Sequence, residues 1–352
     1  MKRITIFAHF DKQNIIDDYV IDYLKELRKY SEIIFVSDGG LKEIETEKIK
    51  DLCFDYICKK HEEYDFGSYK RGFKLIKSKY PKKLQEIDEL LFVNDSCYLI
   101  GNFGNIFADM DKKLDCDYWG LTDHDNGNIQ EYHIQSYFLV FRKRVFLDMS
   151  FENFMCRVKK LQSKDEILYY YEIGLSKLLI KQQNKYFCVF TKNLIDDFLT
   201  KNRQEIEKDL KVLFQKSTNL SASSVKKYLN SILSLEGSNY VYKDKFLVYF
   251  KMGLPILKRT ILNNDNYGNE KLLFLWQEII TEIYPNSAKQ IFNYANRLDL
   301  RLKNRKHIKN NLIIFLRFCH SYKFFYVKNS FKKGKRVKII KLLFFKIKCS
   351  RN

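Results

Sequence analysis

The stretch LLFVNDSCYLIGNF, residues 90–103, begins with four apolar residues and turns polar at Asn94, Asp95 and Ser96. Such an apolar run is typical of a buried strand, and in α/β sheets ligands bind where the strands end. Asp95 is therefore a candidate for holding a metal or a phosphate-bearing substrate. An Asp at a strand end is also a common turn residue, so an ordinary loop is the alternative.

The residues on either side of this stretch alternate between short β-branched or aromatic runs and longer amphipathic stretches, which predicts an α/β sheet. Strands are expected within residues 3–10, 32–40, 54–60, 89–96, 117–123 and 134–146, and helices within 14–30, 67–80 and 163–183. After about residue 195 the pattern becomes helical and highly charged. The expected organisation is an α/β domain over residues 1–195, a helical region over 196–300 and a basic amphipathic tail over 301–352.

The net charge of +20 belongs mainly to this tail, because no Asp or Glu follows Asp299. Residues 301–352 hold 17 of the 63 Lys and Arg residues, which leaves 46 basic against 43 acidic residues before them. Basic residues mixed with Ile, Leu and Phe favour an anionic membrane surface. A solvated basic helix without a ligand is the alternative. Nucleic acid is not an expected partner, since no recognisable nucleic-acid module precedes the tail.

Cysteine spacing and hydropathy limit the cellular setting. The 8 Cys form no CxxC pair, which argues against a zinc site and a secreted disulfide framework and favours a reducing cytoplasm. The opening MKRITIFAHF has too short an apolar run for a signal peptide, and no stretch reaches the length of a membrane-spanning helix. The expected location is cytoplasmic, peripheral on the inner face of the cell membrane.

Polar residues at the predicted strand ends form the candidate ligand site. The carboxyl ends of parallel strands meet at one edge, so these residues are expected to line one crevice. Gly67, at a predicted helix start, suits a phosphate, and the nearby Arg71 adds positive charge. A plain turn and a solvated helix face are the alternative for that pair. The expected donor-binding residues are His9, Asp11, Asp38, Asp65, Gly67, Arg71, Asn94 and Ser96.

Five segments together resemble one protein family. They are IFAHFDKQNIIDDYVIDYLKELRKY, YDFGSYKRG, FVNDSCY, DYWGLTD and HIQSYFLVF, and they resemble the rhamnan synthesis protein F family over roughly residues 1–195. Members of that family are glycosyltransferase-like proteins of bacterial surface-polysaccharide assembly. The resemblance implies a GT-A-like, Rossmann-like mixed sheet flanked by helices, followed here by the helical basic C-terminal region.

The GT-A plan also implies roles for single residues. Asp38 corresponds to the residue that meets the nucleotide base, and Glu172 corresponds to the general base, with Asp165 and Glu166 as nearby competitors. Glu172 serving only the helix dipole is the alternative. The plan has an Asp-x-Asp metal site where this chain reads Asn94, Asp95 and Ser96. One carboxylate provides few ligands for Mg²⁺ or Mn²⁺, so the sequence does not decide whether a divalent cation binds. Asp95 is the candidate ligand.

Two further residues are candidates for contacting the acceptor or phosphate. His133 precedes a predicted buried strand, and a structural histidine is the alternative. Trp119 offers a ring for stacking on a sugar or base, and a core aromatic is the alternative.

The expected function is transfer of a sugar from a nucleotide-diphosphate donor to a lipid-linked or growing surface glycan. Rhamnose is the sugar that the resemblance implies, and an inverting displacement is the expected mechanism, with Glu172 and Asp95 as the catalytic residues. A non-catalytic glycan-binding or assembly subunit is the alternative, favoured by the incomplete metal motif. An RNA-binding protein is a third reading, which rests on the tail alone.

Overall fold

The computed structural model describes residues 1–216, 230, 233, 248, 251–262, 280–281, 285–302, 325–332, 335–342 and 346–350. The chain divides into two compact units, Met1–Tyr294 and Ala295–Asn352. Of the tail expected over residues 301–352, residues 301–302, 325–332, 335–342 and 346–350 are among the described residues, and the rest lies outside them.

The first unit contains an eight-stranded mixed sheet with strand order β3-β2-β1-β4-β8-β6-β7, and β9 pairs with the other side of β6. Strands β1 (Arg3–His9), β2 (Glu32–Ser37), β3 (Asp55–Cys58) and β4 (Glu89–Asn94) run parallel. Strand β8 (Phe138–Arg142) lies antiparallel between β4 and β6 (Tyr118–His124). Strand β7 (His133–Ile134) runs antiparallel to β6, and β9 (Tyr186–Phe190) runs parallel to it. The expected α/β architecture with a mixed sheet is confirmed.

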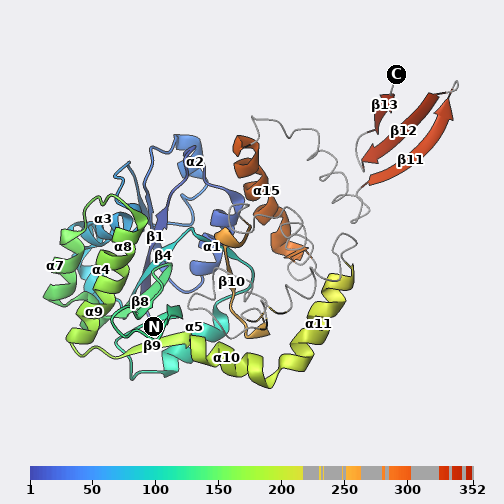
Figure 1. Ribbon diagram of the computed structural model, residues 1–352. Coiled ribbons are helices and arrows are strands. Elements are labelled where there is room, and N and C mark those ends of the chain that lie inside the picture. The colour runs from blue at the N-terminus through green and yellow to red at the C-terminus, as the bar shows by residue number, and fades with distance from the viewer. Residues whose placement is uncertain are drawn as a thin grey trace. The chain divides into compact units, whose positions relative to one another are not determined.

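Helices cover both faces of this sheet, because β1 and β4 are buried along their whole length and carry apolar side chains on both faces. On one face, Tyr69 of α3 (Tyr64–Lys79) stacks on Phe92 of β4 with ring centroids 4.5 Å apart. On the other face, Tyr23 of α1 (Asp18–Leu27) meets Phe7 of β1 edge-on at 5.6 Å. Figure 1 shows α3, α7 and α9 gathered on one side of the sheet.

The remaining helices of the first unit connect and flank the strands. They are α2 (Glu43–Glu47), α4 (Pro81–Glu86), α5 (Gly104–Lys112), α6 (Lys143–Phe146), α7 (Met149–Arg157), α8 (Lys164–Ile167), α9 (Gly174–Lys181), α10 (Lys192–Lys201) and α11 (Arg203–Lys216). The π-helical segment η1 (Leu168–Ile173) joins α8 to α9, so the helix expected over residues 163–183 is a chain of three segments. No helix of the described residues is both long and apolar enough to cross a membrane.

A buried charge network holds the sheet at the amino end of β4. Glu89 is fully buried, and its carboxylate accepts hydrogen bonds from Arg3 at 2.6 Å, Arg142 at 3.3 Å and the indole of Trp119 at 3.1 Å. Burying a carboxylate is costly unless cations and donors compensate it, as they do here. Trp119 is itself fully buried. This burial agrees with the alternative that Trp119 is a core aromatic residue, because an acceptor sugar cannot reach a buried ring while the sheet is intact.

The region after residue 195 is not wholly helical. Helices α10, α11 and α15 (Pro285–Leu302) agree with the expected helical character, but β10 (Ile256–Lys258) pairs antiparallel with β5 (Cys97–Leu99) and continues into the 3₁₀ segment η3 (Arg259–Leu262). In the second unit, β11 (Phe325–Lys332), β12 (Lys335–Leu342) and β13 (Lys346–Ser350) form an antiparallel sheet. Residues 325–332, 335–342 and 346–350 are therefore strands, where the sequence predicted a helical C-terminal region.

Candidate active site

Strands β1, β2 and β4 end together, as the sequence predicts. The pairing register sets His9 opposite Ser37 and Ala8 opposite Asn94. The turn that follows β4 therefore lies beside the end of β1, at the carboxyl edge of the parallel strands. This edge is where ligands bind in open α/β sheets.

Asp95 is buried at this edge and is held from several sides. Its backbone N–H donates to the Ala8 carbonyl at 3.1 Å, and its Oδ2 accepts from the Phe10 N–H at 3.1 Å. The Nε2 atom of His9 lies 3.9 Å from the same oxygen. On the other side, Arg259 Nη2 lies 3.5 Å from Oδ1. Both carboxylate oxygens thus already face nitrogen donors.

His9 supports this arrangement from β1. Its Nδ1 lies 3.0 Å from the Ser37 hydroxyl, which fixes the orientation of the ring. Burial lowers the pKa of His9, although the negative charges of Asp95 and Asp11 oppose that effect. The ring is therefore predominantly neutral near neutral pH and adds no fixed positive charge beside Asp95.

A chain of hydrogen bonds crosses the turn after β4. The Lys258 ammonium donates to the Ser96 hydroxyl at 2.8 Å, and this hydroxyl donates to Asn94 Oδ1 at 2.5 Å. The Asn94 amide donates in turn to Asp65 Oδ2 at 2.6 Å. All three residues of the NDS motif are thus engaged, and the chain links a lysine at one end to a carboxyl group at the other.

Asp65 is the most perturbed carboxyl group of this cluster. Burial, followed by the charge of Asp95, raises the pKa of Asp65 from its usual 3.8 to about 7. Glu172 shifts it in the same direction, whereas Lys258 and Arg259 oppose the rise. These five ionisable groups consequently share one neighbourhood. Perturbed carboxyl groups of this kind cluster at functional sites.

Lys258 and Arg259 are the site residues that sequence reasoning missed. Pairing of β10 with β5 sets Lys258 opposite Cys97, and the Arg259 N–H donates to the Ser96 carbonyl at 3.0 Å. The contact joins residues about 160 positions apart in the chain, and no local pattern predicts such a pairing. The available signal was a short apolar run, LPIL, ended by two consecutive basic residues.

Aromatic groups fix both cations. Lys258 is buried, and its Nζ lies 4.1 Å from the centroid of the Tyr137 ring. Arg259 lies 5.0 Å from the ring centroid of Tyr294, donates to the hydroxyl of that residue at 2.7 Å and also contacts the hydroxyl of Tyr19. Although burial disfavours its charge, Tyr19 and Asp95 raise the pKa of Arg259, so it stays a cation.

Glu172 faces this cluster from the π-helical segment η1. Its Oε2 accepts from the Ser136 N–H at 3.3 Å, and the Ser136 carbonyl accepts from the Tyr69 hydroxyl at 3.0 Å. The two alternative general bases make no contact with this cluster. Asp165 is exposed, and the Glu166 carboxylate accepts a hydrogen bond from the Gln162 N–H. The Glu166 N–H donates to the Ser163 hydroxyl, which caps α8. Single π-helical turns often occur at functional sites.

His133 of β7 forms a pair with His124 of β6. Its ring stacks on His124 with centroids 5.1 Å apart, and its Nδ1 lies 2.7 Å from the Glu131 carbonyl. Burial and the neighbouring His133 lower the pKa of His124, whereas the charge of Glu172 is among those that oppose the shift. Glu172 is therefore near enough to act electrostatically on His124, the stacking partner of His133.

The glycine-to-arginine segment does not form the expected phosphate cradle. Helix α3 begins at Tyr64, and the Gly67 N–H already donates to the Glu63 carbonyl at 3.0 Å. A Cβ atom at Gly67 would lie 2.8 Å from His61 Nδ1, so this glycine allows the preceding loop to pack closely. Arg71 donates to Glu63 Oε2 at 2.6 Å and to the Gly67 carbonyl at 2.9 Å. The cations beside Asp95 are Lys258 and Arg259 instead.

Asp38 and Asp11 mainly organise loops. Asp38 Oδ1 accepts from the N–H groups of His61 at 2.6 Å and Glu62 at 3.0 Å. Asp11 Oδ1 accepts from the N–H groups of Gln13 at 2.8 Å and Ile15 at 3.3 Å. Both bond sets stabilise turns directly after a strand, as Asp commonly does.

A family model described as rhamnan synthesis protein F matches residues 33–245, more than half of the chain. The chain belongs to this family. The part matched to the rhamnan synthesis protein F family contains Asp65, the turn from Asn94 to Ser96, and Glu172, and it ends before Lys258.

Several solved structures are similar to the chain. A putative nucleotide-diphospho-sugar transferase from Desulfovibrio desulfuricans G20 has 10% identity and a TM-score of 0.32, covering 53% of this chain and 79% of that one. The mannosyltransferase Ktr4p from S. cerevisiae has 9% identity and a TM-score of 0.29, covering 48% and 62%. The glycosyltransferase GlyE from Streptococcus pneumoniae TIGR4 has 9% identity and a TM-score of 0.37, covering 85% and 64%. The chain spans less than two thirds of the latter two proteins. No curated protein matches the chain by sequence.

The residues at the carboxyl edge do not fit a divalent cation. Across the ranges that the structure describes, no three His, Cys, Asp or Glu residues come together as a metal-binding group. The carboxylate oxygens of Asp95 face the Phe10 N–H and the Arg259 guanidinium. The Lys258 ammonium donates a hydrogen bond to the Ser96 hydroxyl. Mg²⁺ and Mn²⁺ require several oxygen ligands, whereas this family member presents nitrogen donors at the turn.

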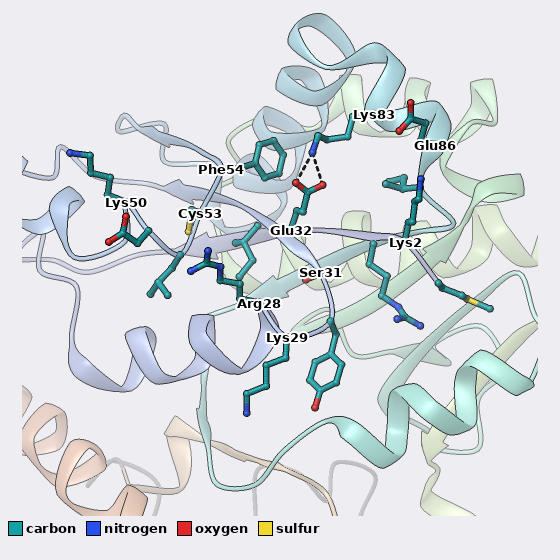
Figure 2. A pocket seen from close by; sticks show the side chains of 17 residues that line it. Lys2, Arg28, Lys29, Ser31, Glu32, Lys50, Cys53, Phe54, Lys83 and Glu86 are labelled. Carbon is teal, nitrogen blue, oxygen red and sulfur yellow. Dashed lines mark hydrogen bonds and ion pairs between the residues drawn. The ribbon is translucent and has the colours of Figure 1, made fainter.

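A hollow of about 930 Å³ lies at the opposite edge of the sheet. Figure 2 shows it lined by Arg28 and Lys29 from the end of α1, by Glu32 at the start of β2, and by Lys83, which bonds both carboxylate oxygens of Glu32 at 2.5 Å. None of the site residues predicted from the sequence lines it.

Proposed function

We propose that the chain is a glycosyltransferase that moves a sugar from a nucleotide-diphosphate donor to a growing bacterial surface glycan. The observation that carries this proposal is the convergence of Asp65, Asp95, Glu172, Lys258 and Arg259 at the carboxyl edge of a member of the rhamnan synthesis protein F family. Rhamnose is the proposed sugar, as the family description suggests. The acceptor is proposed to be lipid-linked or a growing polysaccharide.

The proposed reaction is a direct displacement with inversion at the anomeric carbon. The acceptor hydroxyl oxygen forms a bond to that carbon while the bond from the carbon to the diphosphate oxygen breaks. The proton of the hydroxyl passes to Glu172, and the nucleoside diphosphate leaves with the bonding electron pair. Lys258 and Arg259 stabilise the charge that develops on the leaving group. Asp95 and the Asn94 to Ser96 turn position those cations.

A matched pair of glutamate variants tests the role of Glu172. Glu172→Gln should slow sugar transfer by about a hundredfold because the amide cannot accept the proton, while donor affinity stays nearly unchanged. Glu166→Gln, in α8 of the same helical run, is the control and should transfer at the wild-type rate. Equal transfer by Glu172→Gln and wild type would remove Glu172 from the mechanism.

A non-catalytic assembly subunit is the second candidate function. The single carboxylate of the Asn94-Asp95-Ser96 turn favours it. Such a subunit would bind a nucleotide sugar or glycan without releasing nucleoside diphosphate. Wild-type turnover of any one donor therefore excludes this candidate.

The basic tail is proposed to hold the enzyme at the inner, cytoplasmic face of the membrane. Each basic residue near an anionic surface contributes about 1 kcal/mol. Removing residues 301–352 should abolish sedimentation with phosphatidylglycerol vesicles and leave nucleotide binding intact. Vesicle binding that survives the truncation would contradict this assignment.

A further inference from the structure

The charge pattern at the NDS turn raises the question of what neutralises a donor diphosphate there. Two cations, Lys258 and Arg259, reach the turn from a distant segment of the chain through the pairing of β10 with β5. The Arg259 N–H bond to the Ser96 carbonyl fixes both residues to the backbone of the turn. Their position thus depends on Asp95 and Ser96, two of the three residues that stand in place of an Asp-x-Asp motif.

Both cations are fixed before any ligand arrives. The Lys258 ammonium lies 2.8 Å from Ser96 Oγ and 4.1 Å from the centroid of the Tyr137 ring. Arg259 is held by the hydroxyls of Tyr19 and Tyr294 and lies 3.5 Å from Asp95. Preorganised cations in a water-poor site stabilise a phosphate strongly, because little reorganisation is needed when it binds.

These same contacts disfavour a metal ion. A divalent cation at Asp95 would displace Arg259 from Oδ1 and the Phe10 N–H from Oδ2, and it would lie close to two fixed positive charges. The amide oxygen of Asn94 is likewise occupied by the Ser96 hydroxyl and N–H. The turn has the chemistry of an anion site with fixed side-chain cations.

We propose that Lys258 and Arg259 replace the divalent cation at the donor diphosphate, so that this protein binds nucleoside diphosphates without metal. The inference rests on the proposed function, since it assigns the part of that donor site that contacts the diphosphate. Asp95 lies beside Arg259 in this arrangement and does not ligate a metal, and the hydroxyls of Tyr19 and Tyr294 also fix Arg259.

Calorimetric titration of the full chain with dTDP, UDP, GDP and ADP, each in excess EDTA and in Mn²⁺, tests the inference without any substitution. At least one nucleoside diphosphate should bind in EDTA with an affinity within about threefold of that in Mn²⁺, because fixed cations already supply the charge. Binding that requires Mn²⁺ would overturn the inference and retain the proposed donor site. Absence of binding under both conditions would overturn the proposed function and the inference with it.

Substitutions identify which groups bind. Lys258→Met should weaken nucleoside diphosphate binding in EDTA by about tenfold or more, and Lys258→Arg should restore most of the affinity because it keeps the charge. Lys83→Met, at the opposite edge of the sheet, is the control and should bind as wild type. Equal binding by wild type and Lys258→Met would overturn the assignment.

The effect of neutralising Asp95 on nucleoside diphosphate affinity distinguishes a site with fixed cations from a metal site. Asp95→Asn removes a negative charge beside the diphosphate, while the hydroxyls of Tyr19 and Tyr294 and the Ser96 carbonyl still hold Arg259 in place. Affinity in EDTA should therefore increase, by about threefold or more. A metal ligand would behave oppositely, so a loss of affinity restored by raising Mn²⁺ would overturn the inference.

Discussion

Asp65 should make the stability of the protein depend on pH, because its pKa of about 7 lies well above the usual 3.8. Below 3.8 the folded and unfolded chains both carry the proton, and the full stability is present. As the pH rises toward 7 the unfolded chain ionises while folded Asp65 keeps its proton, so stability falls. Each pKa unit is worth about 1.4 kcal/mol, so the loss reaches about 4 kcal/mol once the pH exceeds 7.

Asp65→Asn removes this penalty and keeps an oxygen that accepts from the Asn94 amide. The extra amide N–H group costs about 1 kcal/mol at any pH if it finds no partner. The stability advantage over wild type should therefore grow by about 3 kcal/mol between about pH 5 and pH 8. Urea denaturation followed by intrinsic fluorescence measures it, with the exposed Asp109→Asn as the control. An advantage that does not change with pH would refute a raised pKa at Asp65.

Two further predictions concern the scaffold. Gly72→Ala should destabilise the fold by about 1–3 kcal/mol, because the new Cβ would press on Ile6 where α3 packs against β1. Gly40→Ala is the control, since a Cβ there meets nothing within 4 Å. Equal melting temperatures for the two variants would contradict this packing. Trp119→Phe should lower the free energy of unfolding by about 1–3 kcal/mol, because it removes the indole N–H that donates to buried Glu89. The KM for the acceptor should stay the same. A raised KM with unchanged stability would instead place Trp119 in the acceptor site.

The parallel strands were predictable because each is a continuous buried apolar run that ends in a polar residue. Burial on both faces leaves no competing helical pattern in β1, β2 and β4. The positions of Asn94 and Asp95 followed from strand direction, whereas Asp65 reaches them from the first turn of α3. The sequence thus predicted the edge of the sheet and the carboxyl groups that lie there.

The start of α3 was mispredicted because a contact from a distant segment of the chain sets it. Gly67 and Ser68 are typical of a helix start, but the left-handed backbone conformations lie earlier, at Glu62 with φ 58° and Tyr64 with φ 54°. The Asp38 carboxylate stabilises that turn by accepting from His61 and Glu62. A contact from the loop that follows β2 therefore decides where this helix begins.

The cations of the site were unpredictable for a different reason. Lys258 bonds to Ser96 across 162 positions of the chain, and it arrives through a three-residue strand with no recognisable periodicity. The basic residue that the sequence offered, Arg71, is close to the turn in the chain but bonds Glu63. Pairings between distant strands carry no signal in a single sequence.

The location of the diphosphate is the most direct test of the account. Crystals grown with the nucleoside diphosphate that binds most tightly should show its phosphates in hydrogen-bond contact with Lys258 Nζ and Arg259, at the carboxyl edge of β1 and β4. Phosphates in the basic hollow near Arg28 and Lys83, or anywhere else away from the Asn94 to Ser96 turn, would contradict the proposed donor site.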